Sequence, residues 1–247
     1  MRAYRRFAVL TALLVVLLKL SLVADFATLF ASVIDYLVIN RIRLGSGDFV
    51  LVADPARVEE VWGVLAIAQL AAHILVIAFT FFWIMQANRS ARALGTTDFT
   101  YSPLASVGWY FVPVWNFWKP VHAMAEIWSA SLRGTAEWRM EELPRAFAVW
   151  WPLFIIVNTT GRSAARHILP AQDPSAIVVA NKITLLSDGL SILLTMAFLW
   201  IVRDIQRGQR ARFAALPAPR PEPVYVAEEA PEPDPQPPVP VGQFAPA

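Results

Sequence analysis

Long apolar runs constrain this 247-residue chain more than any other feature of its sequence. The runs cover residues 7–30, 61–85, 145–161 and 183–202. At ~1.5 Å per helical residue, the longer ones reach across the ~30 Å hydrocarbon core of a bilayer. Only 16% of the residues are charged, against about 25% in a typical soluble domain. The sequence therefore predicts an all-α integral membrane protein, a helical bundle with four spans.

Two of the four runs are interrupted. The N-terminal run follows a basic start, as in a signal peptide, but Lys19 breaks it and Leu22-Val23-Ala24 is a poor cleavage site. We therefore expect an uncleaved anchor. The third run is the shortest and contains Pro152, so it is the weakest of the predicted spans.

The composition changes sharply after about residue 213. The stretch "PAPRPEPVYVAEEAPEPDPQPPVPV" is rich in proline and acidic residues and cannot bury an apolar core. We expect a membrane domain over residues 1–213 and a disordered tail with polyproline II character over 214–247. Protein partners are expected to bind through this tail or through a helix on the membrane surface.

The distribution of lysine and arginine predicts the orientation. With four spans, most of these residues fall in the N-terminal segment, the segment between spans two and three, and the tail. The positive-inside rule then places both termini in the cytoplasm of a multi-pass cell-membrane protein. If residues 104–118 also crossed the membrane, the basic excess would move to the side opposite the N-terminus, so we expect that segment not to cross.

The stretch "GWYFVPVWNFWKP", residues 108–120, is too apolar for an ordinary soluble loop. Its apolar part, 104–118, is shorter than the ~17 residues that a transmembrane helix needs. Pro113 breaks a helix, and Trp109 and Trp118 favour the headgroup level. We expect a re-entrant or interfacial segment, in which Asn116 caps broken backbone rather than lining a pore.

The next residues predict an amphipathic helix. Pro120 suits its first turn, after Lys119. One arc of the helix holds Val121, Met124, Ala125, Trp128 and Leu132, and the opposite arc holds His122, Glu126, Ser129 and Arg133. Such a helix is suited to lying in the membrane surface, which makes 104–133 an interfacial region. We hypothesise that Arg89 or Arg92 pairs with Glu126; the alternative is that all three contact water or lipid headgroups.

Three of the predicted spans carry a stripe of polar residues. The stripes comprise Ser21, Asp25, Thr28, Ser32 and Asp35; Gln69, His73 and Thr80; and Thr184, Ser187, Asp188, Ser191 and Thr195. One interpretation is helix packing through small and polar side chains. The other is a polar path lined by Asp25 and Asp188, since carboxylates inside a membrane are costly. We expect Lys19 to snorkel or to meet carbonyl groups, and His73 to be a packing residue.

Several motif residues occur in a fixed order between the second and third runs. They are Trp83, Asn88, Arg89, Ala93-Leu94-Gly95, Ser102-Pro103, Gly108-Trp109, Pro113, Asn116, Trp118-Lys119-Pro120, Met124, Glu126-Ile127-Trp128 and Ser131, followed by "VRDIQRGQ" at 202–209. This pattern resembles the domain-of-unknown-function 4328 family of bacterial multi-span membrane proteins. The resemblance implies a multi-span membrane domain and no established activity. Val114-Trp115 stand where the family usually has a second small or polar pair.

No catalytic motif is present in the sequence. There is no cysteine, the three histidines lack metal-ligand spacing, and the net charge of +2 is too small to indicate nucleic-acid binding. We expect no cofactor and no enzyme activity. The predicted function is a non-enzymatic interaction or scaffold module whose partners are the lipid bilayer and proteins. The alternative is a small transporter or channel-like subunit with a polar intramembrane path.

Overall fold

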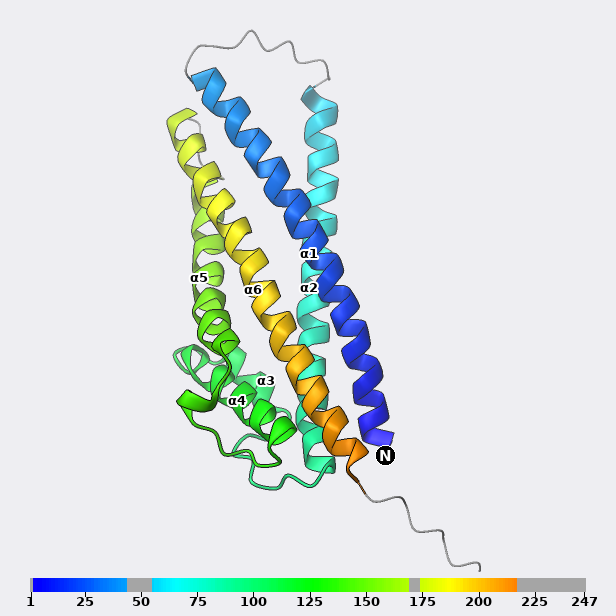
Figure 1. Cartoon of the computed structure of the whole chain (residues 1–247). Coiled ribbons are helices and arrows are strands. Elements are labelled where there is room, and N and C mark those ends of the chain that lie inside the picture. Colours follow the sequence, from blue (N-terminus) through cyan, green and yellow to red (C-terminus); the bar gives the residue numbers. More distant parts are fainter. Residues whose placement is uncertain (1, 44–54, 169–173, 217–247) are drawn as a thin grey trace, which may run out of the picture. The chain divides into compact units, whose positions relative to one another are not determined.

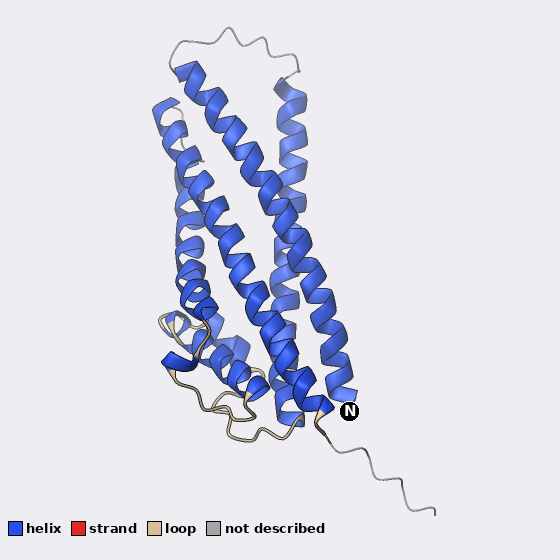
Figure 2. Ribbon diagram, in the orientation of Figure 1, coloured by secondary structure: helices blue, strands red, loops and turns tan. Residues whose placement is uncertain are grey.

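The computed structural model describes residues 2–43, 55–168 and 174–216 of the chain. Within these ranges all regular structure is helical and there is no strand (Figure 2). Three helices are long and apolar enough to cross a membrane, over Tyr4–Ile34, Gln69–Ala93 and Val178–Ala214. The predicted all-α class is confirmed, and the apolar helices are those of a membrane protein.

The long helices are α1 (Arg2–Arg43), α2 (Pro55–Ala93), α5 (Arg145–Ile168) and α6 (Pro174–Ala214). Each extends beyond its predicted apolar run, because good helix formers such as alanine, arginine and glutamine continue the helix past the hydrophobic part. Helix α6 packs against both α1 and α5, and α1 also packs against α2 (Figure 1). The described apolar part of α5, Arg145–Thr159, is shorter than the three membrane-capable segments.

Short helices fill the chain between α2 and α5. They are α3 (Ala105–Gly108), the 3₁₀ turns η1 (Trp109–Phe111) and η2 (Trp115–Phe117), α4 (Lys119–Leu132) and the 3₁₀ turn η3 (Met140–Glu142). Helix α4 packs against α6 and α2, and α3 packs against α2 and α4. Figure 1 shows α3 and α4 grouped at the end of the long helices where the N-terminus lies.

Aromatic contacts bring the start of α1 and the ends of α2 and α6 together. The Tyr4 ring stacks on Phe213, with 4.1 Å between ring centroids. The fully buried Trp83 lies 6.1 Å from Phe7 and donates its indole N–H to the Thr11 hydroxyl at 2.9 Å. Three helix termini from distant parts of the sequence therefore meet at one end of the bundle.

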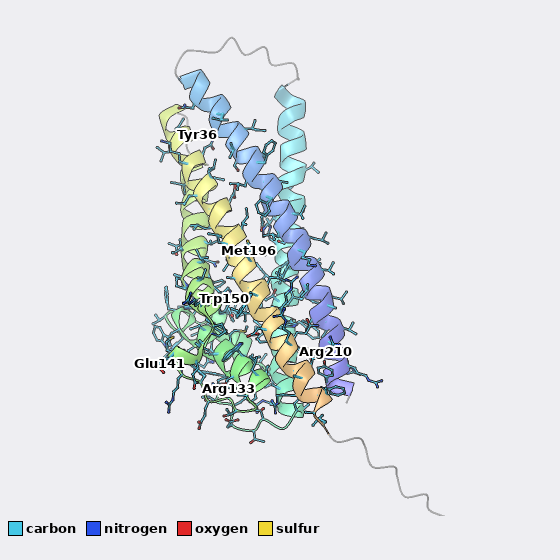
Figure 3. The ribbon with its side chains drawn as sticks, in the orientation of Figure 1. Tyr36, Arg133, Glu141, Trp150, Met196 and Arg210 are labelled. Atoms are coloured by element: carbon cyan, nitrogen blue, oxygen red, sulfur yellow. The ribbon has the colours of Figure 1, made fainter. Side chains whose placement is uncertain are left out.

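The start of α5 lies at the same end. Phe147 contacts Trp128 of α4 edge-to-face at 6.3 Å, and Trp150 stacks on Phe198 of α6 at 5.7 Å. In Figure 3, Arg133 and Glu141 lie at the same end as Arg210, and Tyr36 lies at the other. This end holds all the short helices, so it positions the candidate site described below.

Helix α4 does not lie on a surface, and that prediction is wrong. Its polar residues Glu126 and Ser129 are buried, 4% and 0% exposed, together with Met124 and Trp128 of its apolar face. Two loops cover the polar face and satisfy it with hydrogen bonds, as described below. A helical projection finds the two faces of a helix but not what covers the polar one.

The compact unit of the chain extends over Met1–Ala215. The predicted tail, 214–247, falls outside the described residues from position 217 onward. The connections at 44–54 and 169–173 also lie outside them. The disorder predicted for the tail remains a prediction from composition.

Candidate functional site

The backbone of the Trp-Pro segment, residues 104–118, turns sharply at Pro113. Val112 before the proline is extended, with φ −91° and ψ 114°, as the ring of a following proline requires. Val114 after it has φ 68° and ψ −52°. The Trp115 N–H donates to the Pro113 carbonyl at 2.8 Å, which closes a γ-turn around Val114. This turn separates η1 from η2 and redirects the chain into α4.

Aromatic rings from this segment and from the loop before it surround the ammonium group of Lys119. Its Nζ lies 5.3 Å from the ring centre of Tyr101, 5.7 Å from that of Trp109 and 5.3 Å from that of Trp115. These distances are within the ~6 Å range of cation–π attraction. Nζ also donates to the Tyr101 hydroxyl at 3.2 Å. Trp118 packs edge-to-face on Trp115 at 5.4 Å and extends the cluster.

The outer side of the Trp-Pro segment is apolar and exposed. Phe111 is 68% exposed and Phe117 54%. The full set of exposed large apolar residues is Leu104, Phe111, Val112, Val114, Trp115, Phe117 and Trp118. Contiguous apolar exposure of this kind marks a surface that contacts membrane or protein. Pro113 and Asn116 lie within the same stretch, and the buried Asn116 Oδ1 has no hydrogen-bond partner among the residues that the structure describes.

The inner side of the segment is held by Asn88, which is fully buried on α2. Its amide nitrogen donates to the Tyr101 carbonyl at 3.2 Å and to the Ser106 hydroxyl at 3.1 Å. Its amide oxygen accepts a 2.8 Å hydrogen bond from Nε of Arg92, and Nη2 of Arg92 donates to the Tyr101 carbonyl at 3.0 Å. Both hydrogen bonds that this buried amide donates therefore attach the start of the segment, and the loop before it, to α2.

Glu126 of α4 holds the same backbone from the opposite side. Its carboxylate oxygens accept from the N–H groups of Thr100 at 3.3 Å and Tyr101 at 3.2 Å. Burial raises the pKa of Glu126, and these hydrogen bonds oppose the shift without reversing it. The loop before α3 is thus attached to α2 through a carbonyl and to α4 through amides.

The predicted ion pair with Glu126 does not form. Among the described residues, neither Arg89 nor Arg92 lies within ion-pair distance of Glu126. Arg92 is engaged by Asn88 and by the Tyr101 carbonyl, and its ring contact is with Phe99 at 4.5 Å. Arg89 is exposed. The connection between α2 and α4 therefore runs through the Tyr101 peptide groups rather than through a direct pair of charges.

The end of α6 supplies site residues that the sequence did not single out. The Trp128 indole donates to Asp204 at 2.6 Å. The Gln209 amide donates to the Ala87 carbonyl and to the Ser131 hydroxyl, each at 3.0 Å. A Cβ on Gly208 would lie 2.7 Å from the Ser131 carbonyl oxygen, so α4 and α6 approach as closely as glycine permits. The motif at 202–209 contains these residues, but nothing in it indicates their contacts.

Arg212 joins the C-terminal ends of two helices. Its guanidinium donates to the Leu94 carbonyl at 2.8 Å, to the Thr96 hydroxyl at 2.9 Å, and to the Ala130 carbonyl. Carbonyl groups at helix C-termini lack partners within the helix and carry partial negative charge. One arginine from α6 therefore caps both α2 and α4.

A polar pocket of about 690 Å³ lies over α4. It is lined by Asp98, Thr100, Glu126, Arg133, Thr135, Ala136, Glu137, Trp138, Arg139 and Glu142. Asp98 accepts from the Thr135 hydroxyl at 2.5 Å and the Ala136 N–H at 2.8 Å, and the Thr135 bond in particular lowers the pKa of Asp98. The described residues contain no group of side chains able to hold a metal ion. The walls of the pocket are loops that hydrogen bonds attach to α4.

A second polar cluster lies among the long helices, where the predicted polar stripes meet. His73 Nε2 of α2 lies 3.8 Å from an Asp25 oxygen of α1. Ser32 of α1 donates to Asp188 of α6 at 2.7 Å, which joins the first and third stripes directly. Asp25 is 7% exposed and also interacts with Asp188 and Thr195. Lys19, by contrast, is exposed and forms no ion pair within the described ranges.

Residues 53–207, more than half of the chain, match the family model described as Domain of unknown function (DUF4328). The chain belongs to this family. The DUF4328 match contains the Asn88–Tyr101–Glu126 contacts and the whole Trp-Pro segment, whereas Asp25 of α1 and Arg212 of α6 lie outside it. No curated protein and no solved structure matches the chain.

Proposed function

We propose that this chain is a four-span protein of the cell membrane, with both termini in the cytoplasm, and that it is a non-enzymatic interaction module. The start of α1, the ends of α2 and α6, and the start of α5 lie at one end of the bundle. That arrangement is what an even number of crossings requires. Helix α5 has 24 residues, which gives about 36 Å at ~1.5 Å per residue. Its length supports the fourth crossing, and its described apolar part is Arg145–Thr159.

One observation carries the proposed role: the Trp-Pro segment is apolar on its outer side and is attached by buried hydrogen bonds on its inner side. Phe111, Val114 and Phe117 face outward, while Asn88 and Glu126 bond the preceding loop to two helices. Tryptophan and apolar side chains at the edge of a bilayer anchor a segment at the headgroup level. The apolar side of the segment then forms a binding surface in the inner leaflet for lipids and for protein partners.

Spin labels would test the proposed membrane contact. The chain has no cysteine to remove, so Phe117→Cys and Glu141→Cys each introduce one labelling site; both native residues are exposed. In vesicles, a nitroxide at 117 should collide more often with oxygen, which concentrates in the bilayer, than with a water-soluble nickel chelate. The label at 141 should show the reverse. A label at 117 that behaves like the one at 141 would exclude membrane contact.

The second candidate function is a small transporter or channel-like subunit. The observation that favours it is the meeting of three polar stripes around Asp25 and Asp188. Polar residues at helix contacts within a membrane line substrate and ion paths in many transporters. Ion or proton flux into liposomes should then be lost in Asp188→Asn and kept in Lys182→Gln, which changes an exposed residue of the same helix. Wild-type flux equal to that of empty liposomes would exclude this candidate.

A further inference from the structure

We infer that Lys119 is a binding site for the phosphate of an anionic phospholipid. This inference rests on the proposed placement of the Trp-Pro segment in the membrane interface. It adds the chemical class of the ligand and the group that recognises it.

The Lys119 ammonium has no counter-ion. No carboxylate lies within ion-pair distance of it among the described residues. Its polar neighbour is the neutral Tyr101 hydroxyl, and its other neighbours are the rings of Trp109 and Trp115. Aromatic rings attract a cation but do not neutralise it. Because these neighbours partly remove the ammonium from water, an anion beside it would stabilise its charge more than it would in free solution.

Hydrogen-bond donors around this position are also free to bind an oxyanion. An ammonium group has three donors, and the Tyr101 oxygen takes one of them. Trp115 lies beside the ammonium and Trp118 packs on Trp115; the two residues are 44% and 39% exposed, and each indole has an N–H donor. Phosphate oxygens accept from both kinds of donor.

The N-terminus of α4 adds to the positive potential. Lys119 is the first residue of this 14-residue helix, and the residue before it, Trp118, provides no side-chain cap. Pro120 in its first turn has no N–H, and the His122 N–H donates to the Trp118 carbonyl at 3.2 Å. This end therefore contributes chiefly through the partial positive charge of the helix dipole. The ammonium and the helix end thus both favour an anion at this position.

The surroundings indicate a lipid as the source of the phosphate. Phe111, Val114 and Phe117 form an exposed apolar surface on the same segment, suited to acyl chains. A free phosphate ion would leave that surface in water. A zwitterionic headgroup neutralises its own phosphate with choline, whereas phosphatidylglycerol does not, so the site should prefer the anionic lipid.

Native mass spectrometry of the full chain would test this preference. The protein would be released from nanodiscs of phosphatidylcholine and phosphatidylglycerol, and the bound lipids counted. We expect Lys119→Gln and Lys119→Met to lower the retained phosphatidylglycerol about tenfold, the scale of one charge-assisted contact. Lys119→Arg should keep it, because arginine is also a phosphate ligand. Lys182→Gln is the matched control and should behave as wild type.

Two further arms complete the test. Inorganic phosphate added to the nanodiscs should not displace phosphatidylglycerol; displacement would show a site for the free ion and overturn the lipid assignment. Equal retention in wild type, Lys119→Gln and Lys119→Met would also overturn it. The spin label at position 117 tests the membrane placement of the Trp-Pro segment separately from the phosphate site at Lys119. If it still contacts the bilayer while lipid retention ignores Lys119, only the phosphate site fails; if it lies in water, the membrane placement fails as well.

Discussion

The side-chain amide of Asn88 donates a 3.2 Å hydrogen bond to the main-chain oxygen of Tyr101. The main-chain N–H of Tyr101 donates to the carboxylate of Glu126, which belongs to helix α4. The two peptide groups that flank Tyr101 are therefore held by two helices that are distant in the sequence. The Tyr101 ring in turn contacts Lys119 and Trp109, so the buried hydrogen bonds also position the aromatic cluster.

Asn88→Leu should lower the free energy of unfolding by about 1–3 kcal/mol. It removes the hydrogen bonds from Asn88 to the Tyr101 carbonyl and the Ser106 hydroxyl, and it takes away the acceptor of Arg92 Nε. Thermal unfolding in detergent would measure the loss. Arg89→Ala, one residue along the same helix at an exposed position, is the control and should change stability by less than about 0.5 kcal/mol. Equal effects of the two changes would contradict the role assigned to Asn88.

Gly208→Ala should destabilise the contact between α4 and α6. The added Cβ would lie 2.7 Å from the Ser131 carbonyl oxygen and 2.8 Å from a Leu132 methyl, so the helices must separate, at a cost of about 1–3 kcal/mol. Gly189→Ala in the same helix meets no atom within 4 Å. That control should be neutral or stabilise the helix by up to about 1 kcal/mol. Thermal unfolding of the two variants gives the comparison, and a neutral Gly208→Ala would show that the close approach is wrong.

Val114→Gly should stabilise the protein. Val114 has φ 68°, a region that β-branched residues rarely occupy and that costs of order 1–3 kcal/mol. Glycine removes that strain but loses backbone entropy on folding, so we expect a net gain of about 1 kcal/mol in the free energy of unfolding. Val112→Gly, at an extended residue of the same turn, should destabilise instead. A loss of stability in both variants would contradict the γ-turn.

Glu126 should make stability depend on pH. Burial raises its pKa above the ordinary 4.5, so the folded state binds its proton more tightly than the unfolded state does. The stability that Glu126 contributes through this proton is fully present below pH 4.5 and is lost as the pH rises through the pKa of the folded state. Glutamine at this position does not titrate, so Glu126→Gln removes the pH dependence that Glu126 causes. The difference in melting temperature between wild type and variant should therefore change between pH 4.5 and the raised pKa of Glu126. A difference that stays constant with pH would show that Glu126 titrates as it does when unfolded.

Much of the architecture follows from hydropathy and periodicity alone. Long apolar runs predict helices because only internally bonded backbone is stable in a hydrocarbon environment, and the runs at 7–30, 61–85 and 183–202 lie in membrane-capable helices. The projection places the polar residues of three helices on one face each, and Ser32 of the first stripe contacts Asp188 of the third. That contact is compatible with helix packing and with a polar path alike. These features depend on residues close together in the sequence.

The candidate site was less predictable, because its contacts are long-range. The periodicity of α4 is that of a surface helix, yet two loops bury its polar face: Glu126 accepts hydrogen bonds from one loop, and Ser129 donates to the other. The choice of Arg92 as an ion-pair partner for Glu126 failed because a nearer carbonyl and amide engage its guanidinium. Arg212 carried no local signal at all, since the carbonyl groups that it caps belong to α2 and α4.

The central claim is that the end of the bundle holding α4, the Trp-Pro segment and both chain ends faces the cytoplasm, so that the chain crosses the membrane an even number of times. Single cysteines at Glu141 and Arg210, both exposed, and at Val50, which lies outside the described residues, can be labelled in intact cells with an impermeant maleimide. We predict labelling at 50 and protection at 141 and 210 until the membrane is opened. Labelling of 141 from outside, with 210 still protected, would contradict the account.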